Sequence, residues 1–408
     1  MKHLTITSVG HVDHGKSTLL GRLLFETGAV SDQRLEQARA RSEELGRPLE
    51  FAFLLDALEE EQAKNITIDL GRFQFRTARS VFTVIDAPGH KEFLKNMVSG
   101  AASADGVILL VDAEEGMRDQ TRRHAYLLRL LGVRQIVVAI NKMDRVGYSR
   151  VAFESNRAQV ESHLAALGLR AGSILPVAAA HGDNVTRPSD QLRWHSGPTL
   201  LEALEALEPS APLDRLPARF PVQDIYSGPD GDIAVGRLEA GTLRAGETLR
   251  FWPSGTEIPL NLVSSRRAGS QPEARAGESI ALQLPRDVAV ERGQIGTAPG
   301  LPPRVARELR ASLFWLGRQP LEKGKAYLLR LATVETAATV RGIERIVRTE
   351  SLSSVTGDLP SVAHSEVAEV LLETEQPVPF DRFSEVPTTG RIVLLDGGEV
   401  SGGGILTQ

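Results

Sequence analysis

Residues 4–20 read LTITSVGHVDHGKSTLL. The alternating apolar run over residues 4–9 is typical of a β-strand, and the stretch after Ser17 favours a helix. The residues between them, 10–17, fit the pattern G-x-x-x-x-G-K-[ST] of a phosphate-binding loop. The alternative is a chance glycine-rich turn, but the position between a strand and a helix argues against it. This stretch therefore predicts a nucleotide-binding domain built on a mostly parallel sheet.

The residue types in this loop match what a bound triphosphate needs. The glycines let backbone N–H groups close around the β-phosphate, Lys16 neutralises the β- and γ-phosphates, and the Ser17 hydroxyl binds Mg²⁺. The dipole of the following helix adds to this attraction. His11 and His14 also form an H-x-x-H pair, which occurs in metal sites and in nucleotidyl transferases. Because both histidines lie inside the phosphate loop, we do not expect them to bind a metal.

A second element, Asp86-Ala87-Pro88-Gly89, follows an apolar strand about seventy residues beyond the loop. The Asp86 carboxylate is placed to reach Mg²⁺ through water, and the Gly89 amide to sense the γ-phosphate. The next residue, His90, carries an imidazole that can position the attacking water. A D-x-x-G sequence alone is equally consistent with a plain turn, so its spacing from the phosphate loop is what supports the prediction.

A third element, Asn141-Lys142-Met143-Asp144, ends another apolar strand. The Asp144 carboxylate can accept hydrogen bonds from guanine N1–H and the exocyclic amine, which adenine does not offer. The alternative, a helix-capping loop, would not explain three such elements in order at strand ends. The sequence thus predicts that GTP is bound in preference to ATP.

The segment Asn65-Ile66-Thr67-Ile68-Asp69 lies between the phosphate loop and Asp86. In that position a switch segment would supply the Thr67 hydroxyl to Mg²⁺ only while a γ-phosphate is present. By composition alone, the same residues fit the start of a β-strand.

The first two hundred residues alternate apolar runs with amphipathic stretches, as parallel strands and crossover helices do. The pattern predicts strands over the ranges 4–9, 80–85, 106–111, 135–140 and 173–177. It also predicts helices over the ranges 121–131 and 154–167.

Beyond Pro209 the helical pattern stops, and from Phe220 onward short alternating runs are separated by glycine turns, which favours β-barrels. A second break falls at residues 299–303. We therefore predict a P-loop domain over residues 1–212, a β-barrel over 213–300 and a second β-barrel over 301–408.

The 408 residues contain 41% hydrophobic and 24% charged side chains, values typical of a globular protein of about three domains. There is no cysteine, so disulfides, thiolate catalysis and cysteine-bound metals are excluded. No run reaches about 18 apolar residues, and the start lacks the pattern of a signal peptide. We expect a cytoplasmic protein with no membrane contact. The net charge of −5 argues mildly against a surface wholly adapted to nucleic acid.

These motifs, in this order, resemble the translation-factor GTPases, a family that includes elongation factor Tu, elongation factor 1-alpha and the GTPase large subunit of ATP sulfurylase. The resemblance covers the whole chain and includes residues 220–225 and 390–396. It implies a GTPase domain followed by two β-barrels, with Val12 and Ile66 as an apolar gate that restrains His90. Two positions depart from the family pattern: Asn65 replaces a glycine, and Ala178 replaces the serine of the base-contacting loop.

The predicted site follows from the motifs and the resemblance together, with GTP or GDP and Mg²⁺ as cofactors. His90 and Lys16 are predicted to be catalytic, and Ser17, Thr67 and Asp86 to hold the metal. The predicted GTP-binding residues are Gly10, His11, Val12, Asp13, His14, Gly15, Lys16, Ser17, Thr18, Asp86, Gly89, Asn141, Lys142, Asp144, Ala178 and Ala179.

Within the family, three stretches resemble the sulfurylase subunit: residues 182–185 with 194–202, residues 120–124 and residues 311–321. His14 instead matches the elongation factors. Residues 301–408 hold 12 Lys and Arg against 14 Asp and Glu, a net charge of −2 that is poor for binding tRNA phosphates. We therefore expect the sulfurylase subunit.

On this interpretation the chain hydrolyses GTP with a water near His90, while Lys16 and Mg²⁺ stabilise the developing charge. Hydrolysis would drive the transfer of AMP from ATP to sulfate on a separate small catalytic subunit. One alternative is a translation GTPase that carries aminoacyl-tRNA to the ribosome. Another is a regulatory GTPase that recruits a different protein of sulfur metabolism.

Overall fold

A computed structural model describes residues 1–55, 71–86, 104–133, 135–210, 212–228, 231–260, 262–265, 273–348 and 353–408. The chain divides into two compact units, Met1–Ser210 and Ala211–Gln408, and each is described by itself. Within the described residues, no helix has the length and apolar character needed to cross a membrane.

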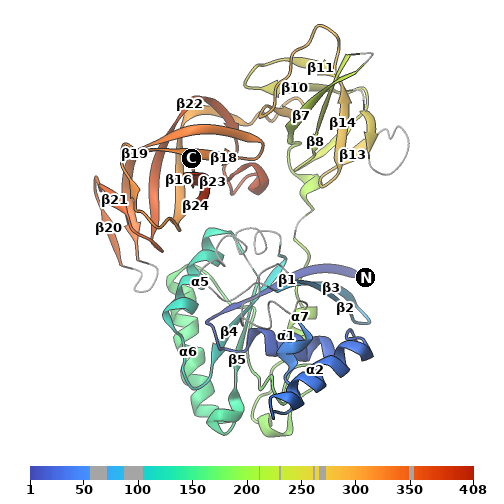
Figure 1. Cartoon of the computed structure of the whole chain (residues 1–408), viewed down its shortest axis with the longest axis vertical. Helices are drawn as coiled ribbons and strands as arrows, with labels where there is room; N and C mark the ends of the chain where they lie inside the picture. Colours follow the sequence, from blue (N-terminus) through green and yellow to red (C-terminus); the bar gives the residue numbers. More distant parts are fainter. Residues whose placement is uncertain are drawn as a thin grey trace. The chain divides into compact units, whose positions relative to one another are not determined.

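The first unit contains a six-stranded sheet with the strand order β2-β3-β1-β4-β5-β6 (Figure 1). Only the edge strand β2 is antiparallel to its neighbour, and the other neighbouring pairs are parallel. The strands are β1 (Lys2–Gly10), β2 (Gly71–Arg76), β3 (Ser80–Asp86), β4 (Gly106–Asp112), β5 (Ile136–Asn141) and β6 (Ser173–Pro176).

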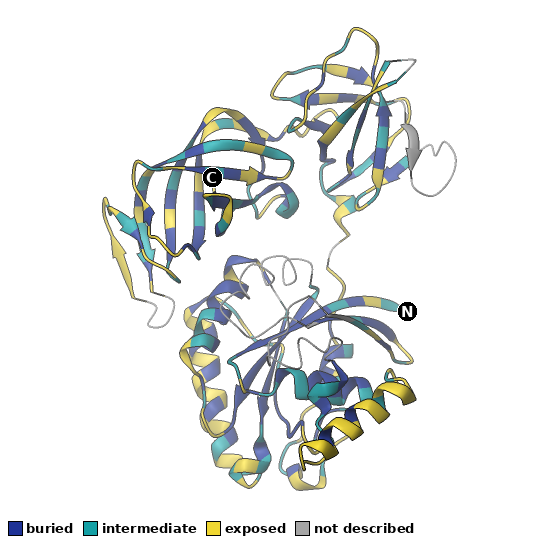
Figure 2. Ribbon diagram, viewed as in Figure 1, coloured by how far each residue is buried: buried dark blue, intermediate teal, exposed yellow. Residues whose placement is uncertain are grey.

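Helices cover both faces of this sheet, with α5 and α6 on one side and α1 and α7 on the other (Figure 1). The helices are α1 (Lys16–Glu26), α2 (Asp32–Glu44), α5 (Asp119–Leu130), α6 (Arg150–Ala166) and α7 (Leu200–Glu205), with short 3₁₀ turns η1 (Phe51–Leu54), η3 (Met143–Val146) and η4 (Asp190–Leu192). Because alternate residues of a strand point to opposite faces, Ile108 and Leu110 of β4 join the core beneath α1 and α7. Every residue of β4 is buried, as Figure 2 shows for the middle of the sheet.

The predicted α/β P-loop fold is confirmed, and each predicted strand and helix of this unit is found with ends shifted by at most a few residues. The continuous apolar runs of β4 and β5 belong to strands that are buried on both faces. The sequence analysis missed β2, whose six residues form a short edge strand with arginines among the phenylalanines.

The second unit is made of antiparallel sheets. Its first part holds a seven-stranded sheet, β11-β10-β15-β7-β8-β14-β12, and the small sheet β13-β9. The elements are η5 (Leu213–Arg215), β7 (Phe220–Gly228), β8 (Gly231–Arg237), β9 (Thr242–Arg244), β10 (Thr248–Trp252), β11 (Glu257–Pro259), β12 (Leu262–Ser265), β13 (Glu273–Arg275), β14 (Ser279–Gln283) and β15 (Ile295–Thr297). They enclose a core that includes Phe220 and Phe251.

The second part has the strand order β18-β23-β24-β16-β22-β19-β20, and pairing of β18 with β19 closes it into a barrel. The elements are β16 (Arg304–Trp315), β17 (Leu321–Glu322), β18 (Ala326–Leu331), β19 (Val334–Val347), β20 (Ser354–Thr356), β21 (Ser361–Val362), β22 (Val367–Phe380), η6 (Pro387–Thr389), β23 (Arg391–Asp396) and β24 (Glu399–Leu406). A separate core around Trp315 fills it. The predicted pair of antiparallel barrels is thus confirmed, while the boundaries after residues 212 and 300 remain our proposal.

The two barrels of this unit share a buried ion pair. Arg219, just before β7, donates from Nε and Nη2 to the two carboxylate oxygens of Asp381, each at 2.7 Å. Both side chains are at most 4% exposed. Thr389 Oγ1 also donates to Asp381 at 2.6 Å, and Arg219 Nη1 donates to the Leu301 carbonyl at 3.0 Å. This network ties the segment before β7 of one barrel to the connection between β22 and β23 of the other.

Candidate functional site

The phosphate loop, residues 10–17, joins β1 to α1 as the sequence predicts. Gly15 has φ of +87°, and a Cβ there would lie 2.6 Å from Asn141 Nδ2, so only glycine fits. Lys16 Nζ donates to the carbonyls of Gly10 at 3.1 Å and His11 at 2.8 Å, which holds the ammonium across the loop. The half-buried Ser17 follows in the first turn of the helix.

Asn141, the last residue of β5, connects the phosphate loop to the loop that follows β6. Its Nδ2 donates to the His14 carbonyl at 2.9 Å, and its Oδ1 accepts from the Ala179 amide at 3.0 Å. Asn141 is only 2% exposed, so both bonds form away from water. This geometry makes Asn141 an internal link between the two loops.

Lys142 and Asp144 follow Asn141 in a strained turn. Lys142 adopts a left-handed backbone conformation with φ of +61°, which is uncommon for a side chain of this size. Its ammonium pairs with buried Asp112 at 2.7 Å. Burial alone would raise the pKa of Asp112, but the bond from Lys142 and the backbone N–H groups of residues 114 and 115 lower it below the usual range. Asp144 keeps its side chain 27% exposed.

We call residues 178–183 the base loop; it follows β6. The Ala178 amide donates to the Asp183 carbonyl at 3.1 Å, and the Gly182 amide to the Ala178 carbonyl at 2.9 Å, so the loop is a closed turn. Ala178 is fully buried and Ala179 is 2% exposed. The amides of Ala178 and Ala179 therefore both have acceptors inside the protein.

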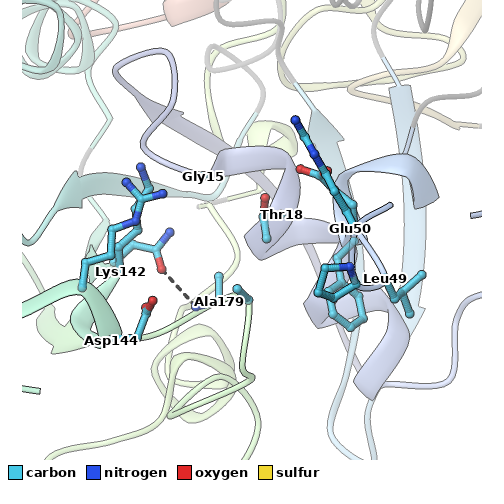
Figure 3. A pocket seen from close by; sticks show the side chains of 13 residues that line it. Gly15, Thr18, Leu49, Glu50, Lys142, Asp144 and Ala179 are labelled. Carbon is cyan, nitrogen blue, oxygen red and sulfur yellow. Dashed lines mark hydrogen bonds and ion pairs between the residues drawn. The ribbon is translucent and has the colours of Figure 1, made fainter. Parts of the chain in front are cut away.

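These loops surround a pocket of about 350 Å³, a volume within the range of small-molecule sites. Figure 3 shows Lys142 and Asp144 on one side, Leu49 and Glu50 on the other, and Gly15 and Thr18 between them. The pocket is lined by Gly15, Thr18, Arg47, Pro48, Leu49, Glu50, Phe51, Asn141, Lys142, Asp144, Arg145, Ala179 and Ala180. The structure thus brings together predicted residues from three distant parts of the sequence.

The sequence analysis missed one entire wall of this pocket. Residues 47–51 form this wall. Arg145 and Ala180 also line the pocket, and none of these residues was among those predicted. The segment Arg47-Pro48-Leu49-Glu50-Phe51 has no nucleotide motif, and it reaches the site because η1 packs on α1. Gly21 permits this contact, since a Cβ there would lie 2.0 Å from the Phe51 carbonyl oxygen. No local pattern in the sequence signals such packing.

Thr67, Gly89 and His90, and the gate residue Ile66, lie outside the described residues. The backbone of Asp86 ends β3, but its side chain is outside the described part. The predicted roles of all these residues stay predictions.

Two buried histidines, His14 in the phosphate loop and His124 on α5, lie close to Lys16 or to its loop. His14 is fully buried, with Nδ1 3.3 Å from the Leu110 carbonyl oxygen and Nε2 3.7 Å from a Glu115 carboxylate oxygen. His124 on α5 is 4% exposed. Burial lowers the pKa of His14, and burial together with the nearby Lys16 charge lowers the pKa of His124 to about 3. Both imidazoles are therefore neutral near pH 7.

The first unit should lose stability in acid through His124. Its pKa is about 3 when folded and close to 6.5 when unfolded, so below pH 6.5 the unfolded chain takes up the proton first. The contribution of neutral His124 to the free energy of unfolding is therefore fully present above pH 6.5. It falls by up to about 1.4 kcal/mol per pH unit as the pH drops towards 3. We expect His124→Gln to flatten this dependence.

Urea unfolding at pH 7.5, 6.0 and 5.0, followed by circular dichroism at 222 nm, measures this effect, because the α-helices of the described residues belong to the first unit. His3→Gln at an exposed position is the control and should follow the unmodified protein. An equal pH dependence for His124→Gln and unmodified protein would contradict the assignment.

Comparison with known proteins gives the relationship. The family model described as elongation factor Tu GTP binding domain matches residues 1–210, and a second, described as GTP-eEF1A C-terminal domain-like, matches residues 308–407. The chain belongs to the elongation factor Tu family of GTP-binding proteins. It is therefore a GTPase that binds GTP.

Relatives in this family extend along the entire chain. Elongation factor 1-alpha of Archaeoglobus fulgidus is 35% identical over 413 residues, covering 99% of this chain and 97% of the relative. Elongation factor 1-alpha of Pyrococcus furiosus is 36% identical over 418 residues, again covering 99% and 97%. A solved structure of sup35 complexed with GDP covers 100% of this chain and 94% of its own, at 23% identity and a TM-score of 0.46. The family assignment rests on the sequence matches.

The expectation of a sulfurylase subunit is wrong. Elongation factor 1-alpha proteins match at about 35% identity from one end of the chain to the other, the barrels included. The predicted partner, a small ATP-sulfurylase catalytic subunit acting on ATP and sulfate, is withdrawn with it. The family machinery for GTP is shared by all members, so it could not separate them.

The stretches that favoured this choice serve the fold of an elongation-factor-like chain. At the start of α5, Gln120 Oε1 accepts from the Val12 amide at 3.2 Å and so supports the phosphate loop. Trp194 donates from its indole to the Tyr148 carbonyl at 2.9 Å, and its ring centroid is 5.3 Å from that of Phe153. Trp315 fills a barrel core. These internal contacts account for Gln120, Trp194 and Trp315 without a partner.

The charge argument was misleading for a different reason. A net charge of −2 over residues 301–408 averages an entire surface, whereas a nucleic acid contacts a local patch. Neighbouring positive and negative groups are abundant on this barrel, as in the pairs Arg330–Glu335 and Lys323–Asp358. A sum over the domain therefore does not exclude tRNA.

Proposed function

We propose that this chain is a translation factor of the elongation factor 1-alpha type, which carries aminoacyl-tRNA to the ribosome in its GTP form. The observation that carries the proposal is the length of the match: relatives with this name cover 99% of the chain and are themselves covered to 97%. A shared GTPase domain alone would leave both barrels unmatched.

The pocket suits a guanine nucleotide in this proposal. The Asp144 carboxylate accepts from guanine N1–H and the exocyclic amine, while Asn141 keeps the base loop and phosphate loop in register. The base would lie between the Lys142–Asp144 side and the 47–51 segment. Lys16, held across the loop by two carbonyls, would turn its ammonium to the phosphates when they bind.

Hydrolysis adds water across the bond between the β- and γ-phosphates, giving GDP, inorganic phosphate and a proton. Lys16 and the backbone amides of residues 10–17 stabilise the negative charge on the phosphate oxygens. Mg²⁺, when bound, would neutralise further charge, and the Ser17 hydroxyl at the first turn of α1 is in a position to hold it. Thr67, Asp86 and His90 complete the proposed set of catalytic and metal-binding residues. We also propose a cytoplasmic location.

The test uses the purified full chain with aminoacyl-tRNA and ribosomes. In the GTP state, but not the GDP state, the chain should protect the aminoacyl ester from spontaneous hydrolysis, and ribosomes should accelerate GTP hydrolysis at least about tenfold. Lys16→Ala should abolish both effects, because the charge facing the phosphates is lost. Normal GTP binding without ester protection and without ribosome stimulation would overturn the translation assignment and leave the GTPase intact.

A further inference from the structure

Arg22 is the residue of α1 that contacts both walls of the nucleotide pocket. Its Nη1 donates to the Ala180 carbonyl at 3.3 Å and its Nη2 to the His181 carbonyl at 3.0 Å, both in the base loop. On the other side, its guanidinium carbon lies 4.7 Å from the centroid of the Phe51 ring, in the 47–51 segment. One side chain therefore contacts both walls.

The surroundings fix this guanidinium in place. Glu26, one turn further along α1, accepts from Arg22 Nε at 2.5 Å and also accepts from Thr186 Oγ1. Arg22 and Glu26 are only 19% and 16% exposed. Gly182 allows the close approach: its φ is +83°, and a Cβ there would lie 2.2 Å from Arg22 Nη2.

Phe51 is well suited as the second contact. It is 7% exposed, and its ring centroid lies 5.4 Å from that of Phe25 on α1. The 47–51 segment thus rests on α1 through Gly21, Phe25 and Arg22. The base loop rests on the same helix through Arg22. Thr186, three residues beyond the loop, donates to Glu26 of that helix.

We infer that Arg22 is a positioning residue that holds the base loop and the 47–51 segment at the separation a guanine nucleotide requires, and so slows nucleotide release. Arg22 does not line the pocket, so it acts on the ligand through Ala180, His181 and Phe51. A planar guanidinium forms two carbonyl bonds and a stacked ring contact in one fixed geometry, whereas a lysine ammonium is a point charge without this planar fork. The inference rests on the guanine-nucleotide site of the proposed function.

The experiment measures release of a fluorescent GDP analogue and of a non-hydrolysable GTP analogue from the full chain by stopped flow. We expect Arg22→Gln to speed both releases by about 10- to 100-fold, in keeping with the loss of charge-assisted hydrogen bonds. The rate of GTP hydrolysis at saturating GTP should change less than about twofold, because the phosphate loop is untouched. Arg22→Lys should restore only part of the effect, and Phe51→Leu should speed release by a smaller factor.

Arg157→Gln is the matched control, since Arg157 makes the same type of helical pair, 2.9 Å to Glu161, on α6 and away from this pocket. It should leave release unchanged. A double variant of Arg22 and Phe51 should release nucleotide less quickly than the product of the single effects predicts, because both act through one contact.

Release from Arg22→Gln within twofold of the unmodified chain would overturn the inference. Full rescue by Arg22→Lys would also overturn it. So would a fall in the rate of GTP hydrolysis at saturating GTP by as large a factor as the rise in the release rate, because that would indicate a general loss of structure. These measurements involve neither tRNA nor ribosomes, so they stand if the translation assignment fails. A failure of the unmodified chain to bind the GDP analogue would instead overturn the proposed function.

Discussion

Asp144→Asn is expected to weaken GTP binding by about 100-fold or more and to shift the preference towards xanthosine triphosphate. The carboxylate accepts two hydrogen bonds from guanine, and each bond to a charged group contributes about 1.5–3 kcal/mol. The asparagine amide presents a donor where guanine also presents one. Xanthine carries a carbonyl in place of the exocyclic amine, so the new donor finds an acceptor there.

Equilibrium competition with the fluorescent GDP analogue measures both affinities. Asp190→Asn is the matched control, because Asp190 is 88% exposed, pairs only with Arg193 among the contacts of the described residues, and does not line the pocket. Its affinities should equal those of the unmodified chain. Retention of guanine preference by Asp144→Asn would remove Asp144 from base recognition.

Asp381→Ala is expected to destabilise the second unit by about 3–5 kcal/mol, because it leaves the buried Arg219 guanidinium without its counter-ion. Thr389 also loses its acceptor. The double change Arg219→Met with Asp381→Leu should cost much less, since replacing both buried charges by apolar groups is often close to neutral. The single change should therefore be the more harmful of the two.

Urea unfolding followed by tryptophan fluorescence, which reports Trp252 and Trp315 of this unit along with Trp194, measures the loss. Glu335→Ala breaks an exposed ion pair with Arg330 and serves as the control, with an expected change below about 1 kcal/mol. If Asp381→Ala and Glu335→Ala shift the unfolding midpoint equally, the buried pair is not a stabilising link between the barrels.

Much of the fold could be predicted because its signals are local. The strand before the phosphate loop, the buried runs of β4 and β5 and the glycine turns of the barrels each follow from periodicity within a few residues. The edge strand β2 was missed because its six residues, GRFQFR, are too few to give a clear alternation. The expected sulfurylase partner was wrong because residues in the stretches that favoured it, such as Trp194 and Trp315, take part in contacts inside the protein.

The sequence by itself predicted the chemistry of the site: Lys16 closes the phosphate loop after β1, and Asn141 and Asp144 mark the end of β5, in motifs whose spacing has a physical cause. Only the tertiary structure decided what completes the pocket. The 47–51 segment becomes a wall because η1 packs on α1, and Arg22 reaches two carbonyls of a loop 158 and 159 residues away. Such contacts depend on side-chain packing between distant segments, which leaves no pattern in either segment alone.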